Sequence, residues 1–264
     1  MIKNISKKAS RLIYKEGMSF FYKIKPFKLG QIIIVLFHDI IDEKIFSWQV
    51  QVLKQHYNVI SLYELISFVK KGNLNNNRYA AITFDDGFKS NYKIAYKILQ
   101  KLNIPATFYI SPGYIDKKNN LYVTWDMLKE IITSDIISIG NHTYNHFILS
   151  TLDIKQQRQE ILNGKERLED TLGINITSFA YPYGQPWHYT NETVNILRNE
   201  GYDFAVTAFP KSISGSIISE YEIPRIVMDG INKQKDFEIR LSNIWSTIQC
   251  RLTQLKNLKY QLTV

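Results

Sequence analysis

Short apolar runs of strand length alternate along the chain with longer segments that have helical periodicity. Repeated strand–helix units of this kind predict a parallel sheet whose strands are joined by crossover helices. The predicted strands are residues 32–37, 80–84, 106–110, 136–139, 178–181, 204–207 and 222–227. The predicted helices are residues 46–57, 62–69, 90–102, 125–133, 153–172, 191–199 and 235–258.

Two of these helices carry further expectations. In helix 90–102, the side chains Ile94, Ile98 and Leu102 are expected to lie on one face. The long charged helix 153–172 is expected to be capped by Asp153 and ended by Gly173.

Polar side chains that can do chemistry follow the ends of several predicted strands. In a (β/α) barrel, active sites form at the carboxyl ends of the strands. An open doubly wound sheet also places its ligands there. We favour a barrel of about seven parallel strands, because residues at four or more strand ends must converge on one point.

Two short segments could together hold a divalent metal: Thr-Phe-Asp-Asp-Gly at residues 83–87 and His-Thr-Tyr-Asn-His at residues 142–146. Two histidines and one carboxylate leave open positions on the metal, as catalysis requires. Adjacent aspartates on an extended chain point to opposite sides, so one can bind the metal while the other faces a water. If the second segment turns helically, both imidazoles face one way. A His-x-x-x-His pair alone is more often a surface helix pair, and the strand-ending Asp-Asp-Gly reverses that expectation.

With Tyr-Pro-Tyr-Gly at residues 181–184, these segments resemble the first three motifs of the polysaccharide deacetylases, the carbohydrate esterase group of chitin and peptidoglycan deacetylases. The resemblance covers roughly residues 32–228. It implies a distorted (β/α) barrel and metal-dependent removal of N- or O-acetyl groups from sugars. It also implies site roles: Asp85 as general base, Asp86, His142 and His146 as metal ligands, and the backbone N–H of Tyr183 at the oxyanion.

Two departures from the family pattern concern the groups that handle charge and protons. The third motif usually has an arginine before Pro-Tyr, where this chain has Ala-Tyr; Arg225, at the next predicted strand end, is expected to hold Asp85 instead. The usual C-terminal Leu-x-His motif is absent, since no histidine follows His188. His38 ends the first predicted strand, which resembles the poly-N-acetylglucosamine deacetylase branch with its circularly shifted motif order. We therefore expect His38 to be the general acid.

The loop after the third motif is expected to contact substrate. Trp187 could stack on a sugar face, and His188 and Tyr181 are further candidates for substrate binding. One divalent ion is the expected cofactor. Zinc suits a site of two histidines and one aspartate, and other first-row ions also fit.

Charge bears on the expected partners and domains. The formal net charge is +9, but the basic residues are dispersed, which argues against nucleic acid as a partner. They are densest near the start, and residues 1–30 are expected to form a basic helical segment ahead of a catalytic barrel at 31–230. Residues 231–264 are expected to form a helix that packs on the barrel, with peripheral contact to an anionic membrane as the alternative.

The expected cellular location rests on two kinds of segment that we do not find in the sequence. No run has the uncharged core of a signal peptide or the length of a spanning helix, so we expect a cytoplasmic protein or one at the inner membrane face. The one cysteine, Cys250, permits no intrachain disulfide.

The function expected from these residues is removal of acetyl groups from N-acetylated hexosamines, in a polymer or in a lipid-linked precursor. Two alternatives stay open: a catalytically silent barrel that binds carbohydrate, and hydrolysis of another amide or ester at the same metal centre. A basic nucleic-acid or membrane-binding protein is disfavoured because the charge is dispersed.

Overall fold

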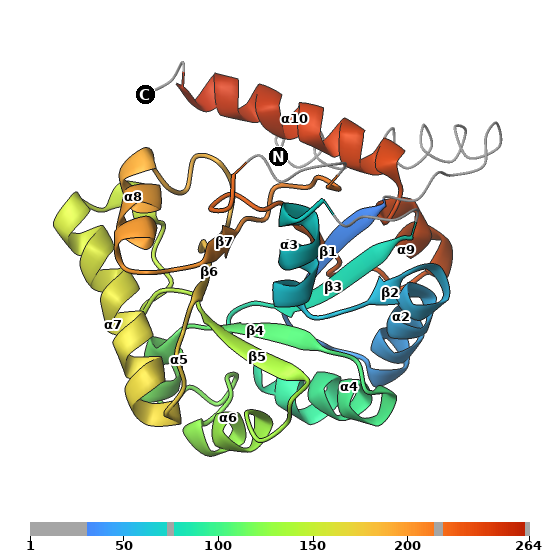
Figure 1. The fold of residues 1–264 in the computed structure, drawn as a ribbon, viewed down its shortest axis with the longest axis horizontal. Helices are drawn as coiled ribbons and strands as arrows, with labels where there is room; N and C mark the ends of the chain where they lie inside the picture. Colours follow the sequence, from blue (N-terminus) through green and yellow to red (C-terminus); the bar gives the residue numbers. More distant parts are fainter. Residues whose placement is uncertain (1–30, 73–76, 214–218, 262–264) are drawn as a thin grey trace, which may run out of the picture.

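The computed structural model describes residues 31–72, 77–213 and 219–261 (Figure 1). The basic segment expected at residues 1–30 lies outside them. Seven strands form one parallel sheet in the order β7-β6-β5-β4-β3-β1-β8. They are β1 (Ile32–Phe37), β3 (Tyr79–Phe84), β4 (Ala106–Ile110), β5 (Ile137–Asn141), β6 (Ser178–Ala180), β7 (Phe204–Val206) and β8 (Ile226–Val227).

The sheet curls into a distorted half-barrel, as expected (Figure 1). Among the described residues, one parallel bridge, between Val206 and Ile223, links the outer strand β7 to the segment just ahead of the other outer strand, β8. A further two-residue strand, β2 (Asn58–Val59), pairs with the first residues of β3. The carboxyl ends of the strands therefore meet around one rim, which is where the candidate site lies.

Helices cover the outer face of the sheet and contribute with it to the larger hydrophobic core. They are α2 (Glu43–His56), α4 (Lys97–Leu102), α5 (Pro112–Asp116), α6 (Trp125–Ile131), α7 (Ile154–Leu172), α8 (Asn191–Asn199) and α9 (Gln234–Arg240). The expected ends of α7 are confirmed: Asp153 caps it with a capping box, and Gly173 ends it in the left-handed conformation.

The interior of the barrel is a second, smaller core that α3 (Leu62–Lys70) helps to fill. Leu62, Leu65 and Ile66 of this helix pack with inward-facing strand residues such as Ile34 and Val206. Figure 1 shows α3 lying between β1 and the β6–β7 side of the sheet. Since the apolar interior contains α3, the polar residues of the barrel gather toward the opposite, carboxyl end.

The helix expected at residues 90–102 differs in its first half. Asn91–Tyr96 is a π-helix, which widens the turn before α4 begins. The buried positions are Asn91, Ala95, Tyr96 and Leu99, whereas Ile94, Ile98 and Leu102 are partly buried and pack against the larger core. The expected face therefore contacts the core, but the most deeply buried residues of this segment are others.

The strand expected at residues 222–227 is reduced to β8 and the bridge at Ile223. Pro224 has no backbone N–H to give to a ladder, so pairing breaks between the two.

The C-terminal segment expected as one helix at 235–258 forms two helices, α9 and α10 (Asn243–Gln261). Ser242 lies between them, and its hydroxyl donates to the Ile239 carbonyl and accepts from the Trp245 amide, in competition with a continuous helix.

The first turn of α10 contacts the barrel through Ser212. The Ser212 amide donates to Ser246 Oγ at 2.7 Å, and its hydroxyl lies 3.0 Å from Asn243 Oδ1. Later positions of α10, including Leu252 and Leu255, are exposed. None of the helices in the described ranges has the length and apolar character needed to cross a membrane.

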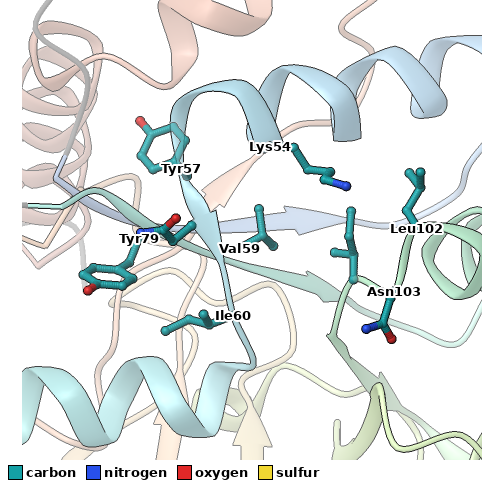
Figure 2. Close-up of a pocket in the computed structure, with 9 residues that line it drawn as sticks. Lys54, Tyr57, Val59, Ile60, Tyr79, Leu102 and Asn103 are labelled. Atoms are coloured by element: carbon teal, nitrogen blue, oxygen red, sulfur yellow. The ribbon is translucent and has the colours of Figure 1, made fainter.

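A groove opens at the amino ends of the strands, beside β2 (Figure 2). It is lined by Lys54, Tyr57, Asn58, Val59, Ile60, Tyr79, Leu102, Asn103 and Ile104. These residues precede or begin β3 and β4, so the groove lies at the opposite end of the sheet from the strand ends that carry Asp85 and its neighbours.

Candidate metal centre and active site

The two aspartates at the end of β3 point in different directions. The amide of Asp85 donates to the Phe37 carbonyl at 3.0 Å, which continues the β1–β3 ladder by one residue. Asp86 and Gly87 follow with φ of 70° and 76°, so the chain turns sharply. As a result, the Asp85 carboxylate pairs with Arg225, and the Asp86 carboxylate faces the histidines.

Arg225 binds the Asp85 carboxylate with both ends of its guanidinium. Nη1 and Nη2 lie 2.7 Å from Oδ1 and Oδ2, and Nη1 also lies 3.2 Å from the Thr83 hydroxyl. Nε donates to the Thr207 carbonyl at 2.9 Å, and the guanidinium lies over the ring of Tyr109. Burial alone would raise the pKa of Asp85, but the charge and hydrogen bonds of Arg225, together with the charges of His142 and His38, outweigh it and hold the pKa below its usual range. Asp85 is therefore ionised near neutral pH.

The two histidines are brought together by a loop, and the helical turn considered from their spacing is absent. Thr143 and His146 both have φ of 61°, in the left-handed region that a helix excludes. The Thr143 hydroxyl accepts a hydrogen bond from the His146 amide at 3.0 Å, which closes the loop. The imidazole centroids of His142 and His146 are 4.8 Å apart.

Asp86, His142 and His146 have the composition and spacing of a divalent metal site. Their three ligand atoms lie within 4.8 Å of one another. Asp86 Oδ1 is 3.4 Å from His142 Nε2 and 3.1 Å from His146 Nε2.

The hydrogen bonding of these groups tests whether they fit a cation. His142 Nδ1 lies 2.7 Å from the Ala180 carbonyl, which can only accept, so Nδ1 carries the proton. In the neutral ring, Nε2 then directs a lone pair toward Asp86, the usual arrangement of a metal-binding histidine. Asp86 Oδ1 is itself buried and accepts no hydrogen bond of good geometry. A lone pair facing a buried carboxylate oxygen is unfavourable unless a cation lies between them, so the residues fit a metal.

Burial and charge act in opposite directions on Asp86. Burial by itself raises the pKa of this carboxyl. The hydrogen bonds and charges of His142 and His146 together lower the pKa by more than burial raises it, so the net shift is strongly downward. Asp86 is thus ionised at all physiological pH values, as a metal ligand must be.

His38 lies at the end of β1, next to Asp85 across the β1–β3 ladder. Its Nδ1 is 2.6 Å from Asp229 Oδ2, and its amide donates to Asp229 Oδ1 at 3.0 Å. Burial lowers the pKa of His38, but the hydrogen bond to Asp229 and the charges of Asp85, Asp229 and Asp86 together raise it to about 9. His38 is therefore protonated at neutral pH, with a third of its side chain exposed.

Asp229 is the site residue that the sequence reasoning missed. It follows β8, and so it is another carboxylate at a strand end, the signal that identified Asp85 and Asp86. Asp39, the neighbour of His38 in sequence, accepts instead from the Ser90 hydroxyl at 2.6 Å.

Three residues of the loop after β6 form an aromatic rim beside the histidines. The ring of Tyr183 lies 4.8 Å from that of His146, and the ring of His188 lies 5.5 Å from Tyr183. Trp187 contacts His188 in turn, at 5.6 Å. Tyr183 is 54% exposed and has φ of 61°. Its backbone N–H donates to no acceptor within the described part of the chain.

Tyr181 does not belong to this rim. Its ring is buried against Tyr189 at a centroid distance of 4.0 Å, and its hydroxyl donates to the Tyr221 carbonyl. The expectation that Tyr181 binds substrate is therefore corrected: the strand carries the side chain into the core, and the residue supports the fold.

Comparison with known proteins places this geometry in a family. The model of the polysaccharide deacetylase family matches residues 72–205. YxkH of Bacillus subtilis, whose name places it in the same family, is 28% identical over 199 residues, 72% of this chain and 69% of that protein. A poly-β-1,6-N-acetyl-D-glucosamine N-deacetylase of Staphylococcus aureus is 28% identical over 195 residues, 69% of this chain and 66% of that protein.

Solved structures show the same fold. IcaB from Ammonifex degensii superposes with a TM-score of 0.68 at 22% identity, covering 83% of this chain and 97% of that one. The deacetylase PplD of Streptococcus pyogenes superposes with a TM-score of 0.66 at 22% identity, covering 77% of this chain and 93% of that one. With a family model that matches half of its length, the chain belongs to the polysaccharide deacetylase family.

Proposed function

We propose that this protein is a metal-dependent deacetylase that hydrolyses the acetamide of N-acetylated hexosamines in a polysaccharide or glycan precursor. The observation that carries the proposal is the arrangement of an ionised base and a protonated acid on neighbouring strands beside the Asp86, His142 and His146 triad. Asp85 and His38 lie on adjacent strand ends, and each has a partner that favours the charge state it needs.

Asp85 is assigned as the general base. Arg225 keeps its carboxylate ionised and fixes both oxygens, so the group is aimed before substrate arrives. It would take a proton from the water that attacks the acetyl carbonyl carbon. A divalent ion held by the triad would polarise that carbonyl and lower the pKa of the water.

His38 is assigned as the general acid. Asp229 accepts from Nδ1, so Nε2 carries the proton that would pass to the amine nitrogen as the C–N bond breaks. The backbone N–H of Tyr183, which has no acceptor among the described residues, would donate to the developing oxyanion. The products are acetate and a free amine on the sugar.

The rim residues and the relatives support a sugar substrate. The Tyr183 ring is open to solvent beside the triad, and Trp187 and His188 extend the aromatic surface from it, which suits stacking on pyranose faces. The staphylococcal relative is named for poly-β-1,6-N-acetyl-D-glucosamine, which favours a β-linked N-acetylglucosamine unit as substrate. We propose zinc as the ion, because two histidines and a carboxylate form a common zinc ligand set.

The test is acetate release from N-acetylglucosamine oligomers and from a lipid-linked N-acetylhexosamine, with zinc and with chelator. We expect release that chelator abolishes and that Asp85→Asn lowers by roughly a thousandfold or more. Release only from the lipid-linked sugar would place the reaction in glycan synthesis at a membrane. If neither substrate releases acetate while zinc is bound, the proposed substrate is wrong.

A further inference from the structure

The loop that carries the two histidines lies directly on one face of α7. We define the ligand loop as residues 141–146 and the α7 platform as Glu160, Ile161 and Gly164. We infer that the α7 platform sets the spacing of His142 and His146, and that Glu160 is a positioning residue for the metal centre. The inference rests on the proposed metal-dependent function.

Glu160 contacts the ligand loop through both its side chain and its backbone. Oε2 accepts from the Asn145 amide and Oε1 accepts from the Asn145 side-chain amide, each at 2.8 Å. The Glu160 carbonyl accepts from the Tyr144 amide at 3.0 Å. One nearly buried residue therefore binds two consecutive residues that lie between the metal-binding histidines.

The other platform residues bring the loop close to the helix. Asn141, at the start of the loop, donates from Nδ2 to the Ile161 carbonyl at 2.8 Å. A Cβ added to Gly164 would lie 2.4 Å from Asn141 Oδ1 and 2.9 Å from the Thr143 carbonyl carbon. Only glycine allows this approach, so the loop contacts the helix along about one turn.

The loop needs such support because its own conformation is unfavourable. Thr143 and His146 both hold left-handed backbone angles, which non-glycine residues adopt only when their surroundings enforce them. Asn145 directly precedes His146, so its peptide sets the direction in which the His146 ring leaves the chain. Lys117 holds Asn145 from the far side, through a 3.1 Å contact from Nζ to Oδ1.

The deciding variant is Glu160→Gln, which preserves size but turns one acceptor into a donor that faces the Asn145 side-chain amide. We expect zinc to bind with a dissociation constant at least about tenfold higher, the usual effect of losing an outer contact of a metal ligand. Glu166→Gln changes the same charge at an exposed position of α7 and should leave zinc affinity unchanged. Equal affinity in Glu160→Gln and wild type would overturn the inference.

A second variant separates positioning from general support of the fold. In Glu160→Gln/Asn145→Asp the donor and acceptor are exchanged, so the same pair of hydrogen bonds can form, and Lys117 gains a charged partner. We expect zinc affinity to return to within about threefold of wild type. If affinity is not restored, Glu160 has only a structural role. Should Glu160→Gln fail to fold, Asn145→Ala removes the side-chain hydrogen bond to Glu160 Oε1 from the loop side, and unchanged zinc affinity in that variant would overturn the inference.

Zinc affinity is measured by competition with a chromophoric chelator, without any turnover. This measurement distinguishes failure of the proposed function from failure of the proposed role of Glu160. A wild-type protein that binds no zinc would refute the proposed function itself, whereas a wild-type protein that binds zinc beside an unaffected Glu160→Gln refutes only the role of the platform.

Discussion

Arg225 is the largest fully buried side chain in the described part of the protein, and its charge is balanced by Asp85. Such a pair contributes little net stability, because desolvation of both charges offsets their attraction. Removing one partner is different, since it leaves a buried charge with no counterion. The pair therefore ties the stability of the barrel to Asp85, the group proposed as base.

This pairing predicts that Asp85→Asn lowers the free energy of unfolding by about 3 kcal/mol or more, in addition to its effect on turnover. Asp85→Asn/Arg225→Met removes both charges and should recover most of that loss while remaining inactive. Urea unfolding of the three proteins is the measurement. A double variant less stable than Asp85→Asn would show that Arg225 does not depend on this counterion.

The environment of His38 predicts how its charge follows pH. Its pKa is raised to about 9 in the metal-free protein, so its protonated form adds stability that is fully present below the ordinary pKa of 6.5. That stability is lost as pH rises through 9. Asp229→Asn should bring the imidazole pKa down by about a unit or more, and the alkaline limb of the rate profile should move the same way. NMR titration of metal-free protein checks the first expectation; an unshifted pKa in Asp229→Asn would contradict it.

At the scale of elements, β4 and β5 are packed so closely that one added methyl group would disturb the site above them. A Cβ at Gly140 of β5 would lie 2.3 Å from Cε1 of Tyr109 on β4. Tyr109 is fully buried, and its ring lies against the guanidinium of Arg225. Displacement of this ring would therefore be passed to the residue that orients Asp85.

We accordingly expect Gly140→Ala to destabilise the protein by about 2 kcal/mol and to lower kcat as well. Gly173→Ala is the control. It forces a side chain into the left-handed end of α7, at a cost of about 1 kcal/mol, but its Cβ would meet nothing within 4 Å. Its kcat should be unchanged. Thermal unfolding and initial rates measure both effects, and a Gly140→Ala enzyme with wild-type kcat would show that Tyr109 does not transmit the strain.

Elements were predictable from sequence where the decisive interactions are local. The ends of α7 follow from Asp153 and Gly173, which act within one turn of the helix. The length of β8 and the break at Ser242 depend on one proline and one hydroxyl whose effect is set by packing. The π-helix before α4 has no comparable sequence signal.

For the whole molecule, metal binding should couple to stability, because the triad draws on two separate strand ends, those of β3 and β5. Zinc at a hundredfold excess over its dissociation constant stabilises the native state by about 2.7 kcal/mol. For a chain of this size that corresponds to a rise in melting temperature of roughly 5–10 °C. We expect His142→Ala to lose this rise. Scanning calorimetry with zinc and with chelator decides, and an equal rise in the variant would contradict the assigned site.

The three candidate metal ligands were predictable from sequence, whereas the pairing of His38 with Asp229 was not. Asp86, His142 and His146 are named by short motifs, and the strand positions around them suffice to bring them together. Asp229 pairs with His38 across 191 residues of sequence, and no local pattern shows that β1 and β8 are neighbours. Only the order of the strands in the folded sheet supplies that information.

The adjacency of β1 and β8 also bears on where a chain of this kind can begin. In the order of the strands across the sheet, Leu36-Phe37-His38 belongs to the strand and strand end beside β8, which Arg225 precedes and Asp229 follows. The position of His38 in the sheet is thus independent of whether β1 comes first or last along the chain. A circular permutation that moved β1 behind β8 would turn an N-terminal acid into a C-terminal Leu-x-His segment without changing any neighbour in the sheet.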